Sequence, residues 1–311
     1  MLPTSNYPNG FGANGVSVLG MPLLNTYPGN VFWVNSTIGG NKGTRAKPFT
    51  TIQYALDKCK ADQGDIIMCG PGHAETVVAA AGLDLDVAGV TLIGLGRGAK
   101  RPTITFSTLI GADMDVDAAN ITMSNFLFVN GIDNLTAPID VNAAYFSMIG
   151  CETRDNNASY HCDDFIVTDA AADSLFIDGW YHNAYGGKTG AQTALSIVGG
   201  NDIVVKNWDI EGDFATALIE NATTKTENIR IYGDGQCFGR STNSADVIVT
   251  LHANATGFIG PNINARLKDN AANITEAFVG ADMQFMQPIN ICNADGEVGM
   301  QTNITASTDA S

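Results

Sequence analysis

With 311 residues the chain has room for one or two domains, and its 45% of hydrophobic residues are ample for a large core. A formal net charge of −16, from 32 acidic residues against 16 Lys and Arg, argues against binding to nucleic acid or to an anionic membrane, because no basic patch is present to neutralise phosphates. There is no apolar run long enough to span a membrane and no signal-peptide pattern at the start, so we expect synthesis in the cytoplasm.

Residues 1–43 do not share the pattern of the rest of the chain. They are rich in Pro, Gly and Asn, a composition that cannot build a core of its own. Within them, apolar residues cluster at Val16, Val18, Leu19, Met21, Leu23 and Leu24. We predict an extended N-terminal arm that docks on another subunit through this cluster, and a leader without fixed structure is the alternative.

Residues 44–82 begin with a short amphipathic pattern. Ile52, Ala55, Leu56 and Cys59 recur at the spacing of one helical face, and Thr50 or Thr51 can accept hydrogen bonds from the free amides at the start of that helix. Gly64-Asp65 then leads into an apolar run, Ile66–Cys69. We predict a helix that caps the end of a stacked structure, followed by its first buried strand.

Residues 83–268 carry the main feature of the sequence, an alternating apolar pattern that recurs every 25 to 31 residues. Its seven occurrences are VTLIGL (Val90–Leu95), ITMSNF (Ile121–Phe126), FSMIGC (Phe146–Cys151), LFIDGW (Leu175–Trp180), IVVKNW (Ile203–Trp208), IRIYGD (Ile229–Asp234) and FIGPNI (Phe258–Ile263). A second alternating stretch, such as LDLDV or MDVDA, precedes most of them. Alternation is the period of a strand, and a repeat of this length is typical of a solenoid.

Each repeat therefore consists of a strand, a short corner, a second strand and a longer variable loop. Asn and Gly at the corners suit tight or left-handed backbone geometry. A leucine-rich repeat is the main rival, but its leucine spacing and helical half are missing. We predict an all-β fold, a right-handed parallel β-helix of about seven to nine coils, in which residues 269–311 close the C-terminal end or contact other subunits and then form a polar tail.

The stretch KPFTTIQYALDKCKADQGDIIMCGPGHAETV resembles the N-terminal signature of pectate-lyase-like β-helix proteins, PF-x-TIQ-x-A followed by GD-x-I-x-x-x-PG. That superfamily includes polysaccharide lyases, polygalacturonases and bacteriophage tailspikes, and the resemblance covers about residues 44–265. The longer run from YPGNVFWVNS to GLGRGAKRPTI is similar to phage-encoded β-helix proteins associated with virions. The resemblance implies the fold and leaves the chemistry open, because function depends on sites carried by a fold.

Candidate catalytic acids are few. Asp163-Asp164 resembles the adjacent acids of polygalacturonases, and Asp178 is a third candidate, but the Gly-His-Gly element of that family is absent. Arg266-Leu267-Lys268 matches its Arg-x-Lys element in only three residues, which chance explains. Arg97 and Arg101 are expected to pair with acids or hold a turn rather than act as lyase bases.

Aromatic and acidic side chains suggest two possible binding sites. Tyr160, His161, Trp180, Tyr181 and His182 could form a sugar-stacking groove beside Asp163 and Asp164, although packing of these side chains on the next coil is the alternative. Asp113, Asp115 and Asp117 alternate along one outward face, with Asp84 and Asp86 one coil below, so they could bind calcium; a solvated acidic face is favoured. The six cysteines lack metal-binding spacing and are expected to be free buried thiols, with Cys151 and Cys162 the pair to check for a disulfide.

These observations favour a non-catalytic structural protein of a bacteriophage virion. The expected form is a homotrimeric capsid decoration or spike protein attached by its arm to the major capsid protein or another virion protein, with no cofactor. The alternative is a tailspike or a free carbohydrate-active enzyme, a hydrolase or lyase, with a glycan in a groove on the side of the β-helix.

Overall fold

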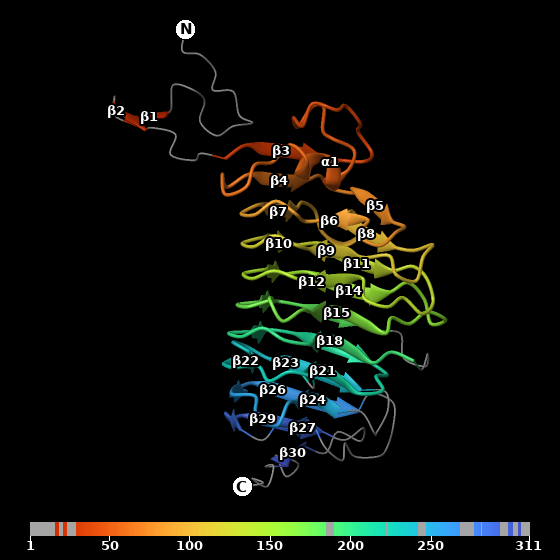
Figure 1. Cartoon of the computed structure of the whole chain (residues 1–311), viewed down its shortest axis with the longest axis vertical. Coiled ribbons are helices and arrows are strands. Elements are labelled where there is room, and N and C mark those ends of the chain that lie inside the picture. Colours follow the sequence, from red (N-terminus) through yellow and green to blue (C-terminus); the bar gives the residue numbers. More distant parts are fainter. Residues whose placement is uncertain are drawn as a thin grey trace.

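The computed structural model describes residues 29–184, 190–221, 223–241, 247–267, 277–280 and 282–292, and the backbone of the short strands 16–18, 21–23, 298–300 and 304–305. Strands dominate, and they form three long sheets that run side by side along a rod (Figure 1). The chain passes through the three sheets in turn and repeats this triplet from β4–β5–β6 to β25–β26–β27. The fold is thus a right-handed parallel β-solenoid, as the sequence repeat predicts.

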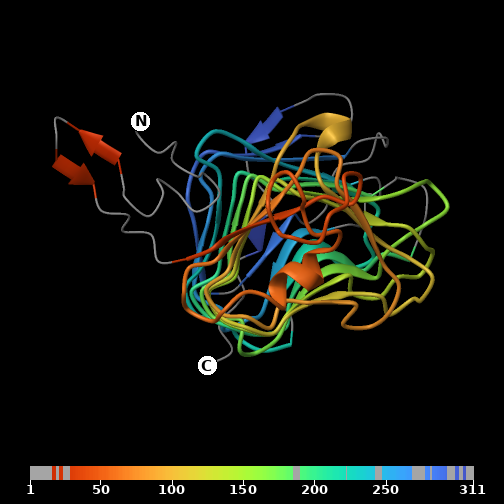
Figure 2. The ribbon, with the colours of Figure 1, turned by 90° about the horizontal axis from the view of Figure 1, so that it is seen from above.

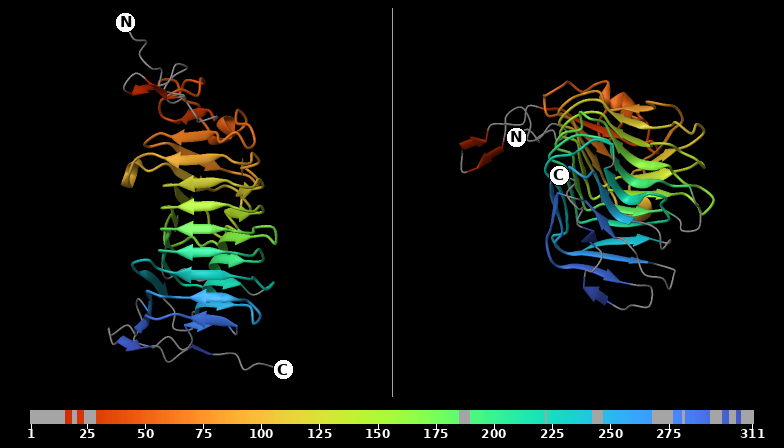
Figure 3. Two further views of the ribbon diagram at one scale, coloured as in Figure 1. Left: turned by 90° about the vertical axis from the view of Figure 1, so that its left-hand side faces the viewer. Right: turned by 60° about the horizontal axis from the view of Figure 1, so that its bottom comes forward.

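The first sheet holds the strands of the seven repeated stretches. Its strands are β3 (Val31–Val34), β4 (Ile66–Cys69), β7 (Thr91–Gly94), β10 (Thr122–Ser124), β13 (Ser147–Ile149), β16 (Phe176–Asp178), β19 (Val204–Lys206), β22 (Ile229–Tyr232), β25 (Gly257–Ile259) and β28 (Met283–Phe285). Figure 3 shows such strands lying one above another along the rod.

The second sheet lies in the part of each repeat where the sequence predicts a loop. Its strands are β5 (Ala74–Val77), β8 (Thr103–Phe106), β11 (Leu127–Asn130), β14 (Glu152–Asp155), β17 (Tyr181–Asn183), β20 (Asp209–Gly212), β23 (Cys237–Ser241), β26 (Ile263–Leu267), β29 (Ile289–Cys292) and β30 (Val298–Met300). Within this sheet β30 pairs antiparallel with β29, whereas the other neighbours are parallel.

The third sheet holds the stretches that precede the repeated pattern. Its strands are β6 (Leu83–Asp84), β9 (Met114–Val116), β12 (Ile139–Val141), β15 (Asp164–Thr168), β18 (Thr193–Ile197), β21 (Ala217–Asn221), β24 (Val247–Leu251), β27 (Phe278–Val279) and β31 (Ile304–Thr305). The parallel ladders thus include strands before residue 83, where the first buried strand is predicted, and continue past residue 268.

The bore of the solenoid is filled by the inward-facing residue of each alternating pair. In the second sheet Ile104 and Phe128 are in register and fully buried, and the rings of Phe106 and Phe126 lie 6.5 Å and 6.2 Å from that of Phe128. Because each coil contacts only its neighbours, the core is a column of such layers and not a single centre.

The corner between the first and second sheets repeats a left-handed residue. Asn125, Gly150, Gly179, Asn207 and Asn262 occupy this corner in different coils, and all have positive φ angles between 53° and 70°. Gly and Asn adopt this conformation at the lowest cost, which is why the repeated pattern carries one of them at its fifth position in most coils. The Asn side chains also connect coils, as when Nδ2 of Asn125 donates to the carbonyl of Gly94 at 2.7 Å.

Two further elements lie outside the three sheets. The helix α1 (Ile52–Leu56) starts at Thr51, whose hydroxyl accepts from the amide of Tyr54, and it packs against β3, β4 and β6 (Figure 2). Its residues Ile52, Ala55 and Leu56 are buried. The hairpin of β1 (Val16–Val18) and β2 (Met21–Leu23) contains four of the six residues predicted to dock, while Leu19 and Leu24 lie outside the described residues.

Candidate functional site

The outer face of the second sheet brings polar and aromatic side chains into two ladders. Strand alternation points every second residue outward, and the parallel register stacks these residues coil upon coil. One ladder runs through Thr103, Leu127, Glu152, Tyr181, Asp209, Phe238 and Asn264. The other, two positions along each strand, runs through Thr105, Val129, Arg154, Asn183, Glu211, Arg240 and Arg266.

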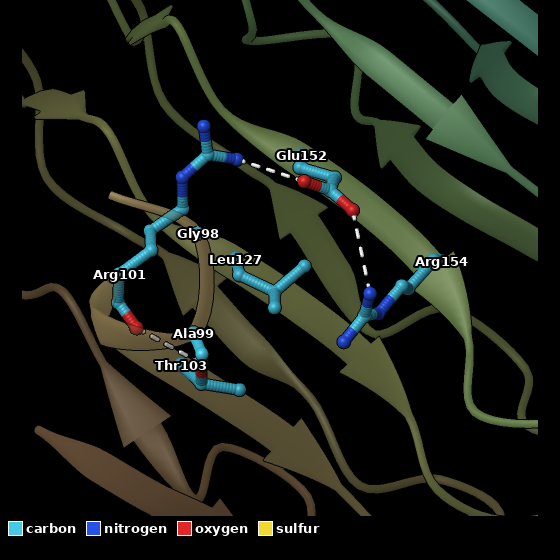
Figure 4. Close-up of a pocket in the computed structure, with 7 residues that line it drawn as sticks. All are labelled: Gly98, Ala99, Arg101, Thr103, Leu127, Glu152 and Arg154. Atoms are coloured by element: carbon cyan, nitrogen blue, oxygen red, sulfur yellow. Dashed lines mark hydrogen bonds and ion pairs between the residues drawn. The ribbon is translucent and has the colours of Figure 1, made fainter. Parts of the chain in front are cut away.

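A pocket of about 460 Å³ lies on this face, between the short 3₁₀ helix η1 (Gly98–Lys100) and the strands β8, β11 and β14 (Figure 4). Leu127 lies between two arginines, Arg101 and Arg154. Although it points outward, only 7% of Leu127 is exposed. The lining is completed by Gly98, Ala99, Thr103 and Glu152.

Glu152 holds both arginines of this pocket. Nη1 of Arg101 donates to its Oε2 at 2.9 Å, and Nη1 of Arg154 lies 3.6 Å from its Oε1. The prediction that Arg101 pairs with an acid is therefore confirmed. Arg97 is exposed and directly precedes η1.

A second charged group lies further along the same face. Arg240 contacts Glu211 through Nε at 3.1 Å and Asp209 through Nη2, and its guanidinium lies 5.8 Å from the ring of Phe238. Burial raises the pKa of the Asp209 carboxyl, although Arg240 opposes the shift. Burial also raises the pKa of the Tyr181 phenol, and the nearby Glu211 adds to this effect.

The predicted catalytic acids occupy two different sheets. Asp164 starts β15 in the third sheet, where its Oδ1 accepts from the hydroxyl of Thr193 at 2.7 Å and burial raises its pKa. Asp178 ends β16 in the first sheet, where it accepts from Nδ2 of Asn207 at 2.9 Å and lies 3.3 Å from Nζ of Lys206. Asp178 is thus part of a charged corner and does not join Asp164 in one site.

Asp163 lies in a small cluster around a histidine. Nδ1 of His161 is 2.9 Å from Oδ1 of Asp133, and its Nε2 is 3.5 Å from Oδ1 of Asp163. The ring is almost buried, and the close approach of Gly190 helps to cover it. This arrangement fixes the ring between two carboxylates and presents little of it to a ligand.

Two of the five predicted sugar-binding residues lie inside the bore. Trp180 and His182 are about 1% and 2% exposed. They share the hydroxyl of Thr153, which accepts from Nε1 of Trp180 at 2.8 Å and lies 2.7 Å from Nδ1 of His182. Burial lowers the pKa of His182 to about 3, so the imidazole is neutral.

Because Trp180 and His182 are buried, neither can stack on a sugar. Both residues instead pack inside the solenoid, which is the alternative given for them in the sequence analysis. Tyr181 faces outward on β17. Tyr160 is half-buried in the loop between β14 and β15, next to His161.

Two of the aspartates proposed for calcium belong to a ladder on the third sheet. Asp84, Asp115 and Asp140 are in register on successive strands, with Asp113 and Asp117 beside them. Burial, followed by repulsion from the neighbouring carboxylates, raises the pKa of Asp115 to about 7. Among the described residues, no group of three or more His, Cys, Asp and Glu side chains is arranged to hold a metal ion. The ladder is an acidic face whose charges repel one another.

The cysteines with described side chains, Cys59, Cys69, Cys151, Cys162 and Cys237, are free thiols. Burial raises the pKa of Cys151 to about 11, so its thiol stays protonated at neutral pH. No helix in the described part of the chain has the length and apolarity to cross a membrane.

The chain matches no protein-family model, and no curated protein or solved structure is significantly similar to it.

Proposed function

We propose that the protein is a non-catalytic structural subunit of a bacteriophage virion, a homotrimeric decoration or spike protein attached through its N-terminal segment to the major capsid protein or another virion protein. The observation that carries this proposal is the set of three ladders along the rod, which are parallel throughout except where β30 pairs with β29. Such a rod is stiff, because bending it must distort many in-register hydrogen bonds at once, and stiffness is what a projecting subunit needs. The phage link itself rests on the resemblance of the run from YPGNVFWVNS to GLGRGAKRPTI, residues 27–104, to phage-encoded β-helix proteins of virions.

Exposed apolar side chains on the rod support the proposed trimer. Large apolar side chains stay exposed on it, among them Leu109, Ile110 and Tyr145, which are 47%, 51% and 56% accessible. Association around a threefold axis would cover such side chains.

The helix α1 supports the role of a cap, because its buried residues lie against the first strands and leave its polar residues outside.

Immunogold electron microscopy of particles from the source tests the virion assignment. Label on heads is expected for a decoration protein, and label on tails would keep the structural role but move it to a spike. Particles without label would refute the assignment and favour the free-enzyme alternative.

The trimer and the attachment are tested separately. Sedimentation equilibrium of the purified chain should give three times the 32.7 kDa of one chain, and a monomer would refute the trimer. A variant without residues 1–30 should still form the trimer but fail to bind particles. If the truncated protein decorates particles as well as the full chain, attachment through this segment is wrong.

A further inference from the structure

The pocket between η1 and the strands β8, β11 and β14 has the size and chemistry of a small-ligand site. Its volume of about 460 Å³ lies within the usual range for such sites, a few hundred to about a thousand Å³. Leu127 and Ala99 supply apolar surface, while the charged groups stand at its upper and right-hand sides in Figure 4. A ligand here would meet an apolar patch and charge within a few ångströms of each other.

The charges in the pocket do not cancel. Two guanidinium groups, those of Arg101 and Arg154, share the single carboxylate of Glu152, which leaves one positive charge in excess. The excess is notable in a chain with 32 acidic residues and only 16 Lys and Arg, because neighbouring acids usually neutralise an arginine in such a protein. The pocket is therefore a positively charged site on an acidic protein.

Both arginine side chains are partly exposed beside the pocket. Arg154 is 45% exposed and its contact with Glu152, at 3.6 Å, is longer than a hydrogen bond. The side chain of Arg101 is 23% exposed, and its Nη1 is bound to Glu152.

We propose that this pocket binds a carboxylate group attached to a small, partly apolar body. The planar fork of a guanidinium matches the two oxygens of a carboxylate. A monoanion neutralises the excess charge, whereas a phosphate dianion would add a negative charge to an already acidic molecule. Leu127 and Ala99 would contact the carbon atoms next to the carboxylate. Free organic acids and carboxylated sugars share this chemistry, and the proposal is independent of the virion role.

Ligand titrations of the ¹⁵N-arginine-labelled full chain, observed by NMR, test the proposal. Butyrate and glucuronate serve as probes for the two sources, with butyramide and glucose as their uncharged counterparts. At least one carboxylate probe should shift the Nε–Hε signals of Arg101 and Arg154, and the uncharged counterparts should not. Stronger binding of butyrate would identify a free organic acid, and stronger binding of glucuronate a carboxylated sugar.

Three variants separate the pocket from general attraction of anions. Arg154→Ala should weaken carboxylate binding at least about tenfold, because it removes a charge-assisted hydrogen bond. Arg97→Ala, the matched control, removes the same charge from an exposed position outside the pocket and should leave binding unchanged. Glu152→Gln should strengthen binding several-fold, because the amide keeps the shape of the side chain and removes the internal carboxylate that competes for both arginines.

Several results would overturn the proposal. One is the absence of binding by both carboxylate probes, and another is binding that Arg154→Ala does not weaken. Tighter binding of inorganic phosphate than of either carboxylate would assign the pocket to a different chemistry. Because the side chain of Arg154 is partly exposed, the folded state of its variant can be verified from an unchanged melting temperature.

Discussion

Replacing Asp115 by asparagine should stabilise the protein at high pH and have a smaller effect as the pH falls. Asp115 lies in the acidic ladder of the third sheet, in register with Asp84 and Asp140 and beside Asp113 and Asp117. Burial and these carboxylates raise its pKa from 3.8 to about 7. The folded protein therefore holds the Asp115 proton more tightly than the unfolded chain does, and lowering the pH favours the folded state.

The size of the effect follows from this difference in pKa. At full weight it corresponds to about 4 kcal/mol of destabilisation when the carboxylate is ionised. The side chain is partly exposed, so water screens much of the repulsion and we expect about 1 kcal/mol. The Asp115→Asn variant should gain that amount at about pH 8, and the gain should shrink as the pH approaches the unfolded-state pKa of 3.8, where the carboxyl takes up a proton in both states.

Urea unfolding at several pH values measures the difference between the two proteins. Asp57→Asn is the matched control, because it removes the same charge from an exposed position after α1. Salt at about 1 M should reduce the gain at high pH. An Asp115→Asn variant that is no more stable than the wild type at about pH 8, or whose gain does not shrink as the pH falls to about 4, would refute the reasoning.

Three further predictions concern the core and the backbone, and urea unfolding measures each of them. Phe128→Ala should cost about 3–5 kcal/mol because the ring is fully buried between two others, whereas Phe176→Ala on the outer face should cost far less; equal losses would contradict the inward direction of Phe128. Gly257→Ala should cost at least about 3 kcal/mol, because φ is 137° and the new methyl would lie 1.9 Å from a carbonyl oxygen. The control Gly235→Ala meets nothing within 4 Å and should change the stability by no more than about 0.5 kcal/mol. A tolerated Gly257→Ala would show that this close approach can relax. Acidification from about pH 7 to pH 5 should lower the stability by about 2 kcal/mol through His182, because its folded-state pKa of about 3 keeps it neutral while the unfolded chain takes up a proton. The variant His182→Leu should abolish that part of the pH dependence. A pH dependence that persists unchanged would mean that His182 is protonated in the folded state.

The alternating strands could be predicted because their apolar residues face one bore. Met114 and Val116 in β9 are buried on either side of Asp115, and the same alternation marks the strands of the first sheet. The ladder of Asp84 and Asp115 followed from this pattern and from the repeat length, and the register confirms it.

The second sheet could not be predicted from the same pattern. In β11 all four residues are buried, so Leu127, Phe128 and Val129 show no alternation. In β14 and β17 the inward positions are Thr153 and His182, polar residues whose Oγ1 and Nδ1 atoms lie 2.7 Å apart inside the bore. A polar pair of this kind is indistinguishable from a loop in a single sequence, because only the structure shows that one residue is the partner of the other.

The candidate pocket was missed for the same reason. Its residues Leu127, Glu152 and Arg154 belong to this unpredicted sheet, and 53 positions separate Arg101 from Arg154. Their proximity depends on the lengths of two whole coils. The GLGRGAKRPTI stretch gave one signal, a local concentration of arginine, but not the acid that holds Arg101 in place.

Because the register of the ladders is constant, the rod can become longer or shorter by whole turns. β10 pairs with β7 on one side and with β13 on the other, so Thr91, Thr122 and Ser147 form one column. Excision of the single turn that contains β10 would bring Thr91 beside Ser147, Leu92 beside Met148 and Ile93 beside Ile149. Each of these new neighbours is a residue of similar kind, so turns could be lost or duplicated during evolution without altering either end of the rod.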